Sequence, residues 1–373
     1  MAEKVERTDG RGILAGDYLN QNRALTRQDW LEDCFPEWGT LLNQEIEDIE
    51  LEKGTVAIWW LGGPSWILKT DEGGIFFIDV YSGPSHYTQY YYCGVCKQAG
   101  AETINWMRLN PQLIDPWKFR RLDGAFSTHK HQDHCDLYTV KAALQTTDCM
   151  FYGPPTTVEK LKSFEVPDER ITTTIVGESV KVPGVQVEFC MNYDETVIKT
   201  GEGTVPDRYE NCATSFLFKT SAGNIMFLGD TWYHDGYKAV GDNYDIDVAI
   251  FDMGMNAPGA TDKMSPYDCA RLGETLKAKV LIPDHYDNWA NTASDPDLLV
   301  SQFERIVSEN TPQIKTVILK PGARFIYPND QNIKRYRYPN QGEGYNAARS
   351  ITYGEYARKY GNNKKPDDKD VDV

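Results

Sequence analysis

The sequence has no long apolar segment and little positive charge. No stretch approaches the roughly 18 uninterrupted apolar residues that a membrane-spanning helix needs. The start, MAEKVERTDGRG, has no apolar core of the kind found in a secretory signal peptide. Lys and Arg number 39 against 55 Asp and Glu, which gives a net charge of −16. Nucleic acids and anionic membranes both require a basic surface, so we expect neither as a partner. We expect an unexported, cytoplasmic protein.

Close cysteine pairs are also scarce. The eight cysteines are thinly spread over 373 residues, unlike the dense framework of a small secreted domain. We expect free thiols in a reducing cytoplasm. Cys93 and Cys96 lie close in sequence, but no second pair completes a zinc site. A Gly-x-Ser-x-Gly motif, a P-loop and a dinucleotide fingerprint are absent, which argues against a serine nucleophile and against nucleotide binding.

One folded unit accounts for most of the chain. Residues 1–25 are polar and without pattern, so we expect an N-terminal extension. Residues 362–373 have almost nothing to bury, so we expect a disordered tail. No repeat, linker or composition break interrupts residues 26–361, and we expect them to form a single domain.

Short apolar runs between turn signals predict strands throughout this unit. Helices are predicted between the later runs, and Ser265 and Asp295 each provide an N-cap before a proline. This pattern suits an α/β (α+β) fold in which sheets pack face to face with helices outside. Trp59, Trp60 and Trp66 are interpreted as core residues. The predicted strands cover residues 56–61, 66–69, 75–80, 124–128, 185–191, 214–220, 224–228, 248–251, 280–283, 316–319 and 324–327.

The strongest chemical signal is the hexapeptide His129-Lys130-His131-Gln132-Asp133-His134, which follows the predicted strand GAFST. It holds three of the chain's six histidines. Imidazole and carboxylate are the usual ligands of zinc, manganese and iron, and alternate residues of an extended turn can aim at one centre. An exposed polar turn is the simpler interpretation, but the concentration of histidines favours metal binding.

The order of these motifs resembles the metallo-β-lactamase superfamily, in which H-x-H-x-D-H follows a strand. Asp79 closes IFFIDV, Asp230 closes IMFLGD and His285 closes VLIPDH. The resemblance implies an αββα sandwich of two packed mixed sheets with helices outside. It implies that Asp79 hydrogen-bonds the ligand loop and that Asp230 bridges two metal ions. The metal ligands that it implies are His129, His131, Asp133, His134, Asp230 and His285.

The superfamily's third motif, a histidine after the strand VQVEFCM, is missing. Asn192, Tyr193 and Asp194 stand there instead. Two arrangements stay open. In the first, Asp194 supplies an oxygen ligand beside His129 and His131. In the second, only one site is filled, and it is built from Asp133, His134, Asp230 and His285. We expect one or two divalent ions, with Mn²⁺ preferred to Zn²⁺ because an oxygen-rich site favours harder ions.

Three further blocks narrow the resemblance to the L-ascorbate-6-phosphate lactonase family: WLEDCFPEWGTLLNQEIEDIELEKGTVAIWWLGGPSWILKT, ATDKMS and LGETLKAKVLIPDHYDNWAN. With the metal motifs, the similarity covers most of residues 28–330. It implies that residues 26–361 form a metallo-β-lactamase-like hydrolase domain. The implied protein is a cytoplasmic, manganese-dependent lactonase of ascorbate catabolism, assembled as a homo-oligomer. It would open L-ascorbate 6-phosphate to 3-keto-L-gulonate 6-phosphate. Asp284 and Tyr286 depart from the family, which commonly has an apolar residue and a second histidine there.

Residues that would bind an anionic sugar-phosphate lactone are less clearly marked. Lys130, Lys263 and Arg324 are the candidate cations, and each also fits an ordinary surface charge. Asn256 stands in the loop MNAPG, which lacks an arginine that is common in the family. His234 could line the pocket or lie on the surface.

The predicted mechanism is metal-hydroxide attack on the lactone carbonyl, with the pKa of the bound water lowered towards about 7. The leaving alkoxide needs a proton, which a metal-bound water could supply or which Asp133 or Asp194 could relay. Asp133, Asp194 and Asp230 are thus the candidate catalytic residues. The alternatives are a phosphodiesterase on the same scaffold and a catalytically degenerate sugar-phosphate-binding protein. The missing third-motif histidine is the only support for the second alternative.

Overall fold

The structure is a computed structural model that describes residues 26–34, 36–83, 86–87, 106–107, 110–199, 208–254, 263–287 and 296–333. Contacts divide the chain into Met1–Arg335 and Tyr336–Val373, and every described residue belongs to the first unit. The Cys93–Cys96 pair, Asn256 and the predicted tail lie outside the described residues. None of the helices searched in the described part is long and apolar enough to cross a membrane. The domain boundaries at residues 26 and 361 stay predictions.

The first sheet has seven strands in the order β16, β1, β2, β3, β6, β7, β8. Neighbours from β16 to β3 run antiparallel, and those from β3 to β8 run parallel. The longest strand, VAIWWLG, is buried along its whole length, as its β-branched and aromatic residues predict. The strands are β1 Val56–Gly62, β2 Ser65–Thr70, β3 Ile75–Ile78, β6 Gly124–Phe126, β7 Met150–Gly153, β8 Ile171–Thr173 and β16 Arg324–Tyr327.

The second sheet also has seven strands, in the order β15, β14, β13, β12, β11, β10, β9. Strands β12 to β15 run parallel, and β9 to β12 run antiparallel. A separate two-stranded pair is formed by β4 His86–Tyr87 and β5 Trp106–Met107. The strands of the second sheet are β9 Ser179–Val182, β10 Val185–Met191, β11 Thr214–Lys219, β12 Asn224–Phe227, β13 Val248–Asp252, β14 Val280–Asp284 and β15 Lys315–Thr316.

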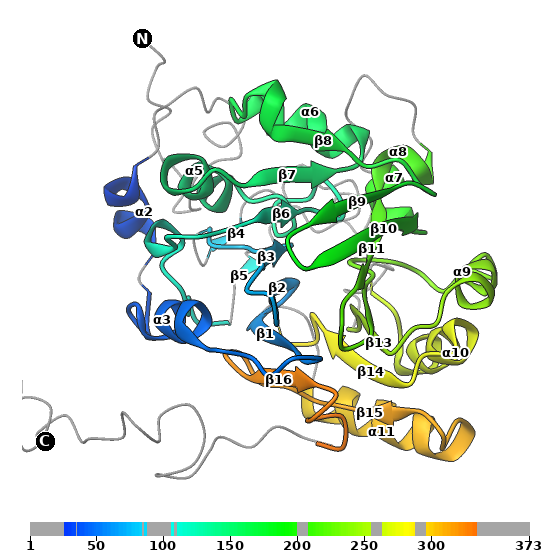
Figure 1. Ribbon diagram of the computed structural model, residues 1–373. Helices are drawn as coiled ribbons and strands as arrows, with labels where there is room; N and C mark the ends of the chain where they lie inside the picture. The colour runs from blue at the N-terminus through cyan, green and yellow to red at the C-terminus, as the bar shows by residue number, and fades with distance from the viewer. Residues whose placement is uncertain are drawn as a thin grey trace, which may run out of the picture. The chain divides into compact units, whose positions relative to one another are not determined.

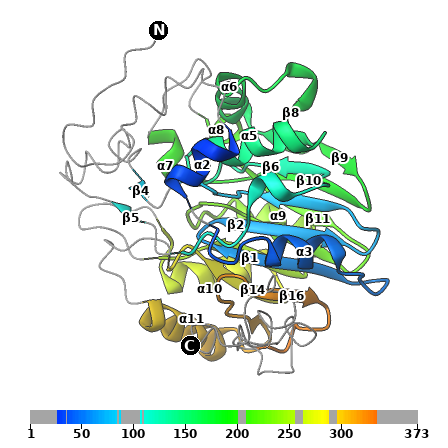
Figure 2. The ribbon, with the colours of Figure 1, turned by 90° about the vertical axis from the view of Figure 1, so that its left-hand side faces the viewer.

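Helices lie outside the two sheets (Figures 1 and 2). α3 and α5 pack on the first sheet through buried apolar side chains. α9 and α11 both contact α10 beside the second sheet. The predicted αββα sandwich is therefore confirmed. The helices are α2 Arg27–Asp33, α3 Leu41–Asp48, α5 Leu137–Thr146, α6 Pro155–Ser163, α7 Glu195–Lys199, α8 Tyr209–Cys212, α9 Tyr237–Asn243, α10 Pro266–Leu276 and α11 Pro296–Asn310, with 3-10 turns η2 Pro116–Lys118 and η3 Asp168–Arg170.

Local signals placed most strands but not all elements. The predicted start of α10 is confirmed: the Ser265 side chain accepts from the backbone N–H of Asp268 in a capping box, with Pro266 at the first turn. The strand predicted at 316–319 reduces to the two residues of β15. Strands β7, β8 and β9 and helices α2, α3, α5 and α6 are among the elements that were not predicted.

Phenylalanine rings fill the space between the sheets. The ring centroids of Phe76 and Phe218 lie 5.9 Å apart, and those of Phe126 and Phe216 lie 5.2 Å apart. All four side chains are buried. Inclined aromatic pairs contribute about 0.5–1.5 kcal/mol each beyond their buried area. This core holds the ends of the two sets of strands at a fixed separation.

The strand ends of the two sheets meet at one place. Parallel strands bring their carboxyl ends to the same edge, and this applies to β3 and β6 in one sheet and to β12, β13 and β14 in the other. A bridge pairs His129 with Ala213, and the Thr214 backbone N–H donates to the Thr128 carbonyl at 2.9 Å. The residues that follow these strands therefore face a common space.

Candidate metal centre

The loop after β6 carries the hexapeptide and folds back on itself. The backbone N–H groups of His134 and Cys135 both donate to the His131 carbonyl, at 3.2 and 2.8 Å. This tight turn brings the imidazoles of His129, His131 and His134 together, with the ring centroids of His129 and His134 3.9 Å apart. His129 and His134 are buried.

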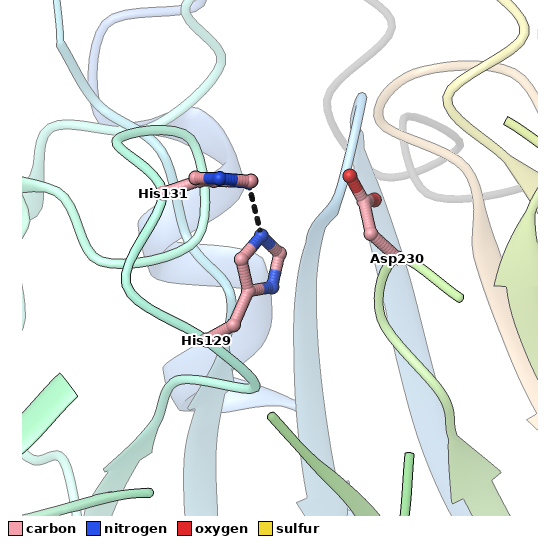
Figure 3. Close-up of side chains that lie close together, drawn as sticks. All are labelled: His129, His131 and Asp230. Carbon is pink, nitrogen blue, oxygen red and sulfur yellow. Dashed lines mark hydrogen bonds between the residues drawn. The ribbon is translucent and has the colours of Figure 1, made fainter. Parts of the chain in front are cut away.

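The first group of donors consists of His129, His131 and Asp230, whose ligand atoms all lie within 4.8 Å of one another. His129 Nε2 and His131 Nδ1 are 2.8 Å apart. Figure 3 shows the two imidazoles on one side and the Asp230 carboxylate on the other. The histidines come from the first sheet and the aspartate from the turn after β12 in the second.

The second group consists of Asp133, His134 and His285, again with ligand atoms within 4.8 Å of one another. His134 Nε2 and His285 Nε2 are 3.3 Å apart. Asp230 Oδ1 lies 3.2 Å from His134 Nε2 and 2.9 Å from His285 Nε2. Asp230 thus belongs to the first group and also contacts the second.

Asp79 lies beneath the ligand loop. Its Oδ1 accepts from the Thr128 backbone N–H at 2.7 Å, and its Oδ2 accepts from the Thr128 hydroxyl at 2.7 Å. Oδ2 is also 2.9 Å from His134 Nδ1. Its backbone has φ of +50°, a conformation that costs a non-glycine residue about 1–3 kcal/mol. His285 is strained in the same way, at +63°. Such strain persists only where the surrounding contacts hold it in place.

Burial and charge divide the histidines of the centre into two kinds. Burial lowers the pKa of His131 to about 3 and that of His129 well below its ordinary value. Burial would also lower the pKa of His134 and His285, but nearby carboxylates, chiefly Asp230, outweigh it. They raise the pKa of His134 well above its ordinary value and that of His285 to about 10. Burial therefore favours the neutral form of the first pair, and the nearby carboxylates favour the protonated form of the second pair.

Lys263 is a predicted cation that reaches the centre. Its ammonium is buried and donates to Asp230 Oδ2. Burial would raise the pKa of Asp230, but Lys263, His285 and His134 lower it far below its usual range. The carboxylate is therefore ionised and available as a ligand.

Arg324 and His234, two other predicted substrate residues, have partners outside the donor groups. Arg324 pairs with Glu45 of α3, with Nη1 and Oε1 3.1 Å apart. His234 is exposed, stacks flat on Tyr193 with ring centroids 4.0 Å apart, and accepts from the Gly236 backbone N–H. The backbone carbonyl of Lys130 accepts from the ammonium of another lysine. The substrate roles of these residues and of Asn256 stay predictions.

The third-motif position holds two buried residues with different contacts. Asn192 Nδ2 donates to the carbonyls of Leu228 and Asp230, at 2.5 and 3.2 Å, and so fastens the turn that carries Asp230. Asp194 Oδ1 accepts from the Thr196 backbone N–H at 2.7 Å. Its Oδ2 lies 3.8 Å from His129 Nε2. Asp194 therefore lies beside the first donor group.

Sequence reasoning missed Asp252 and Thr128. Asp252 is fully buried at the end of β13, and its Oδ1 accepts from the Thr231 backbone N–H at 3.0 Å. Its signal was present in VAIFD, a strand that ends in aspartate as the strands before Asp79 and Asp230 do. Thr128 had no such signal, because a threonine at a strand end is ordinary.

Comparisons with known proteins agree with this geometry. A family model described as "Beta-lactamase superfamily domain" matches residues 99–286. The chain is 33% identical over 335 residues to an Escherichia coli O127:H6 protein described as "Probable L-ascorbate-6-phosphate lactonase UlaG". That alignment covers 86% of this chain and 95% of the relative.

Two solved structures share the fold. Igni18, described as a metallo hydrolase from Ignicoccus hospitalis, has a TM-score of 0.51 and 16% identity over 73% of this chain and 98% of its own. An isothiocyanate hydrolase from Delia radicum gut bacteria has a TM-score of 0.52 and 14% identity over 72% of this chain and 98% of its own. Identities this low speak for the fold alone.

Proposed function

We propose a lactonase activity for this chain, which belongs to the metallo-β-lactamase superfamily and, within it, to the UlaG-like proteins. The proposed substrate is a sugar-phosphate lactone, L-ascorbate 6-phosphate, opened to 3-keto-L-gulonate 6-phosphate. Relatives described as probable L-ascorbate-6-phosphate lactonases support this choice. The single observation that carries the chemistry is the position of the Asp230 carboxylate, which contacts both donor groups.

The donor set fits one or two divalent ions. Two pairs of imidazole nitrogens converge, and a carboxylate stands beside each pair. We propose that the first group, with Asp194, holds one ion and that the second group holds another, with Asp230 shared. The carboxylates favour Mn²⁺ over Zn²⁺. A bound divalent ion would polarise a carbonyl oxygen and lower the pKa of water.

The chain's own residues would supply orientation and proton transfer. The Lys263 ammonium, held against Asp230, puts a positive charge at the centre, where an anionic lactone needs one. Asp133 and Asp194 stand at opposite donor groups, beside His134 and His129. We propose that one of these carboxylates takes up the proton that the attacking water loses and passes it to the leaving alkoxide.

The test is a hydrolysis assay of the purified, Mn²⁺-loaded protein. The expected result is ring opening of L-ascorbate 6-phosphate, and loss of at least about 100-fold in kcat/KM in His131→Ala and Asp230→Ala. Asp242→Asn is the control, because Asp242 forms surface ion pairs with Lys238 and Lys277. The panel includes other lactones and cyclic and linear phosphodiesters. Turnover of phosphodiesters with none of lactones, or full activity in both alanine variants, would refute the proposal.

A further inference from the structure

A buried tryptophan of the first sheet reaches an acid at the centre. Trp66 lies in β2, is 1% exposed, and its indole Nε1–H donates to Asp284 Oδ2 at 2.8 Å. Asp284 ends β14 in the opposite sheet. Packing alone would not require this bond, because a phenylalanine fills much of the same volume without a donor. The indole N–H therefore has a partner in the centre as well as a place in the core.

The second oxygen of Asp284 faces the neighbouring histidine. Asp284 Oδ1 lies 2.6 Å from His285 Nδ1. A carboxylate accepts hydrogen bonds, so this contact places a proton on Nδ1. When a metal ion takes the second ring nitrogen, the imidazole is neutral and Nε2 is the atom with the lone pair. Nε2 is the atom that faces Asp230, at 2.9 Å.

The packing around this chain of contacts holds it rigid. The Trp66 ring stacks near Trp60, with centroids 5.9 Å apart, and meets Phe227 edge-on at 6.2 Å. Tyr286 packs against Trp60 at 5.4 Å, and its hydroxyl donates to the Leu319 carbonyl at 2.8 Å. The residue after His285 is thus anchored, and the left-handed backbone of His285 turns its ring back toward Asp284.

We propose that Trp66 and Asp284 are positioning residues for His285. Trp66 fixes Asp284, and Asp284 fixes both the ring orientation and the tautomer of His285, so that its Nε2 points at Asp230 and His134. This inference rests on the proposed function only in taking the centre to bind a divalent ion. It does not depend on which substrate is hydrolysed.

Asp284→Asn is the sharpest test, because the side chain keeps its size while one of its two hydrogen-bond acceptors becomes a donor. The amide oxygen can still accept from Trp66, but the amide nitrogen then donates to His285 Nδ1. This bond favours the tautomer with the proton on Nε2, in which that atom has no lone pair for a metal ion. We expect Mn²⁺ affinity measured by calorimetry to fall about 10- to 100-fold, and the absorption spectrum of the Co²⁺-substituted protein to change. Trp66→Phe should weaken affinity by about tenfold, the lower end of that range.

A second indole–carboxylate bond in the same fold provides the control. Trp59 Nε1 donates to Glu45 Oε1 at 3.1 Å, on the α3 side of the first sheet. Glu45→Gln should change the melting temperature without moving Mn²⁺ affinity by more than about twofold. Affinity and Co²⁺ spectra like wild type in Trp66→Phe and in Asp284→Asn would overturn the inference. Should Asp284→Asn fail to fold, wild-type affinity in Trp66→Phe would overturn it alone. A wild-type chain that binds Mn²⁺ but opens no lactone would refute the proposed function and leave this inference standing.

Discussion

Among single residues, Asp230 decides how the two donor groups are connected. It comes from the second sheet, whereas His129, His131 and His134 come from the first. Its charge is held by a buried lysine on one oxygen and faces two imidazoles on the other. The lysine and the two imidazoles lower the pKa of this carboxyl and so stabilise its ionised form. An incoming metal ion must therefore compete with the Lys263 ammonium for Asp230 Oδ2.

Asp194 is the residue whose replacement tests the altered third motif. We expect Asp194→Asn to weaken metal binding at the first donor group by about tenfold or more, because a charged oxygen beside His129 becomes neutral. The fold should be retained, since the amide oxygen can still accept from the Thr196 backbone N–H. The measurement is metal stoichiometry and affinity of the purified variant.

The matched control for Asp194 is another buried acid that caps a short turn. Asp115 is fully buried and accepts from the Trp117 backbone N–H at 3.1 Å, and it pairs with Arg27. Asp115→Asn should keep the metal affinity of the wild type. Equal metal affinity in both variants would remove Asp194 from the ligand set and leave only the second group and Asp230.

Sequence reasoning worked best for residues whose role is indicated by the residues next to them in the sequence. Asp79, Asp230 and His285 each follow an apolar strand, so their meeting at a sheet edge could be predicted. The partnership of Trp66 with Asp284 could not, because it joins positions 218 residues apart and depends on which way an indole faces. The neighbour of Arg324 could not be predicted either, because its guanidinium pairs with Glu45, 279 residues away in the sequence.

At the scale of secondary-structure elements, the turn after β12 sets the position of Asp230. Gly229 has φ of +69°, and a Cβ there would lie 2.4 Å from the Thr128 hydroxyl. Glycine is thus required both by the backbone conformation and by the close approach of the ligand loop. The third-motif asparagine fastens the same turn from the other side.

Gly229→Ala is expected to destabilise the fold and to disturb the centre. The left-handed backbone costs alanine about 1–2 kcal/mol, and the overlap with Thr128 adds about 1–3 kcal/mol. Urea unfolding measures the sum. Gly177→Ala is the matched control, because Gly177 has φ of +91° with nothing within 4 Å of the added Cβ. A free energy of unfolding that falls equally in both variants would contradict the packing argument.

Element prediction was limited where neighbouring segments, rather than local pattern, decide the structure. Strands β1, β10 and β11 carry long β-branched and aromatic runs and were predicted to within a residue or two. β8 and β9 are short and partly exposed, and they form because they pair with β7 and β10. Pairing of that kind is set by topology, which a local window does not contain.

At the scale of the whole molecule, the donor groups join the two sheets. An ion held by His129, His131 and Asp230 would contact both halves of the sandwich, and unfolding would release it. We expect Mn²⁺ at 100 times its Kd to stabilise the folded state by about 2.7 kcal/mol. Scanning calorimetry should show a rise in melting temperature of about 5 °C, reversed by a chelator.

The control for this prediction is the same titration with Asp230→Ala, in which the melting temperature should no longer depend on Mn²⁺. A wild-type melting temperature that is independent of Mn²⁺ and of chelator would mean that the donor groups do not take the ion. A rise of equal size in Asp230→Ala would mean that the ion binds elsewhere.

Because the candidate ligands come from two sheets, they are synthesised at different times. A growing chain acquires the histidines of the hexapeptide first, Asp230 about a hundred residues later, and His285 last. Until the ribosome has passed His285 and the second sheet has docked, the nascent chain displays imidazoles without the enclosure that would select an ion. An ion that needs both donor groups would therefore be acquired only at the final stage of biogenesis, and a truncated product would lack part of the donor set.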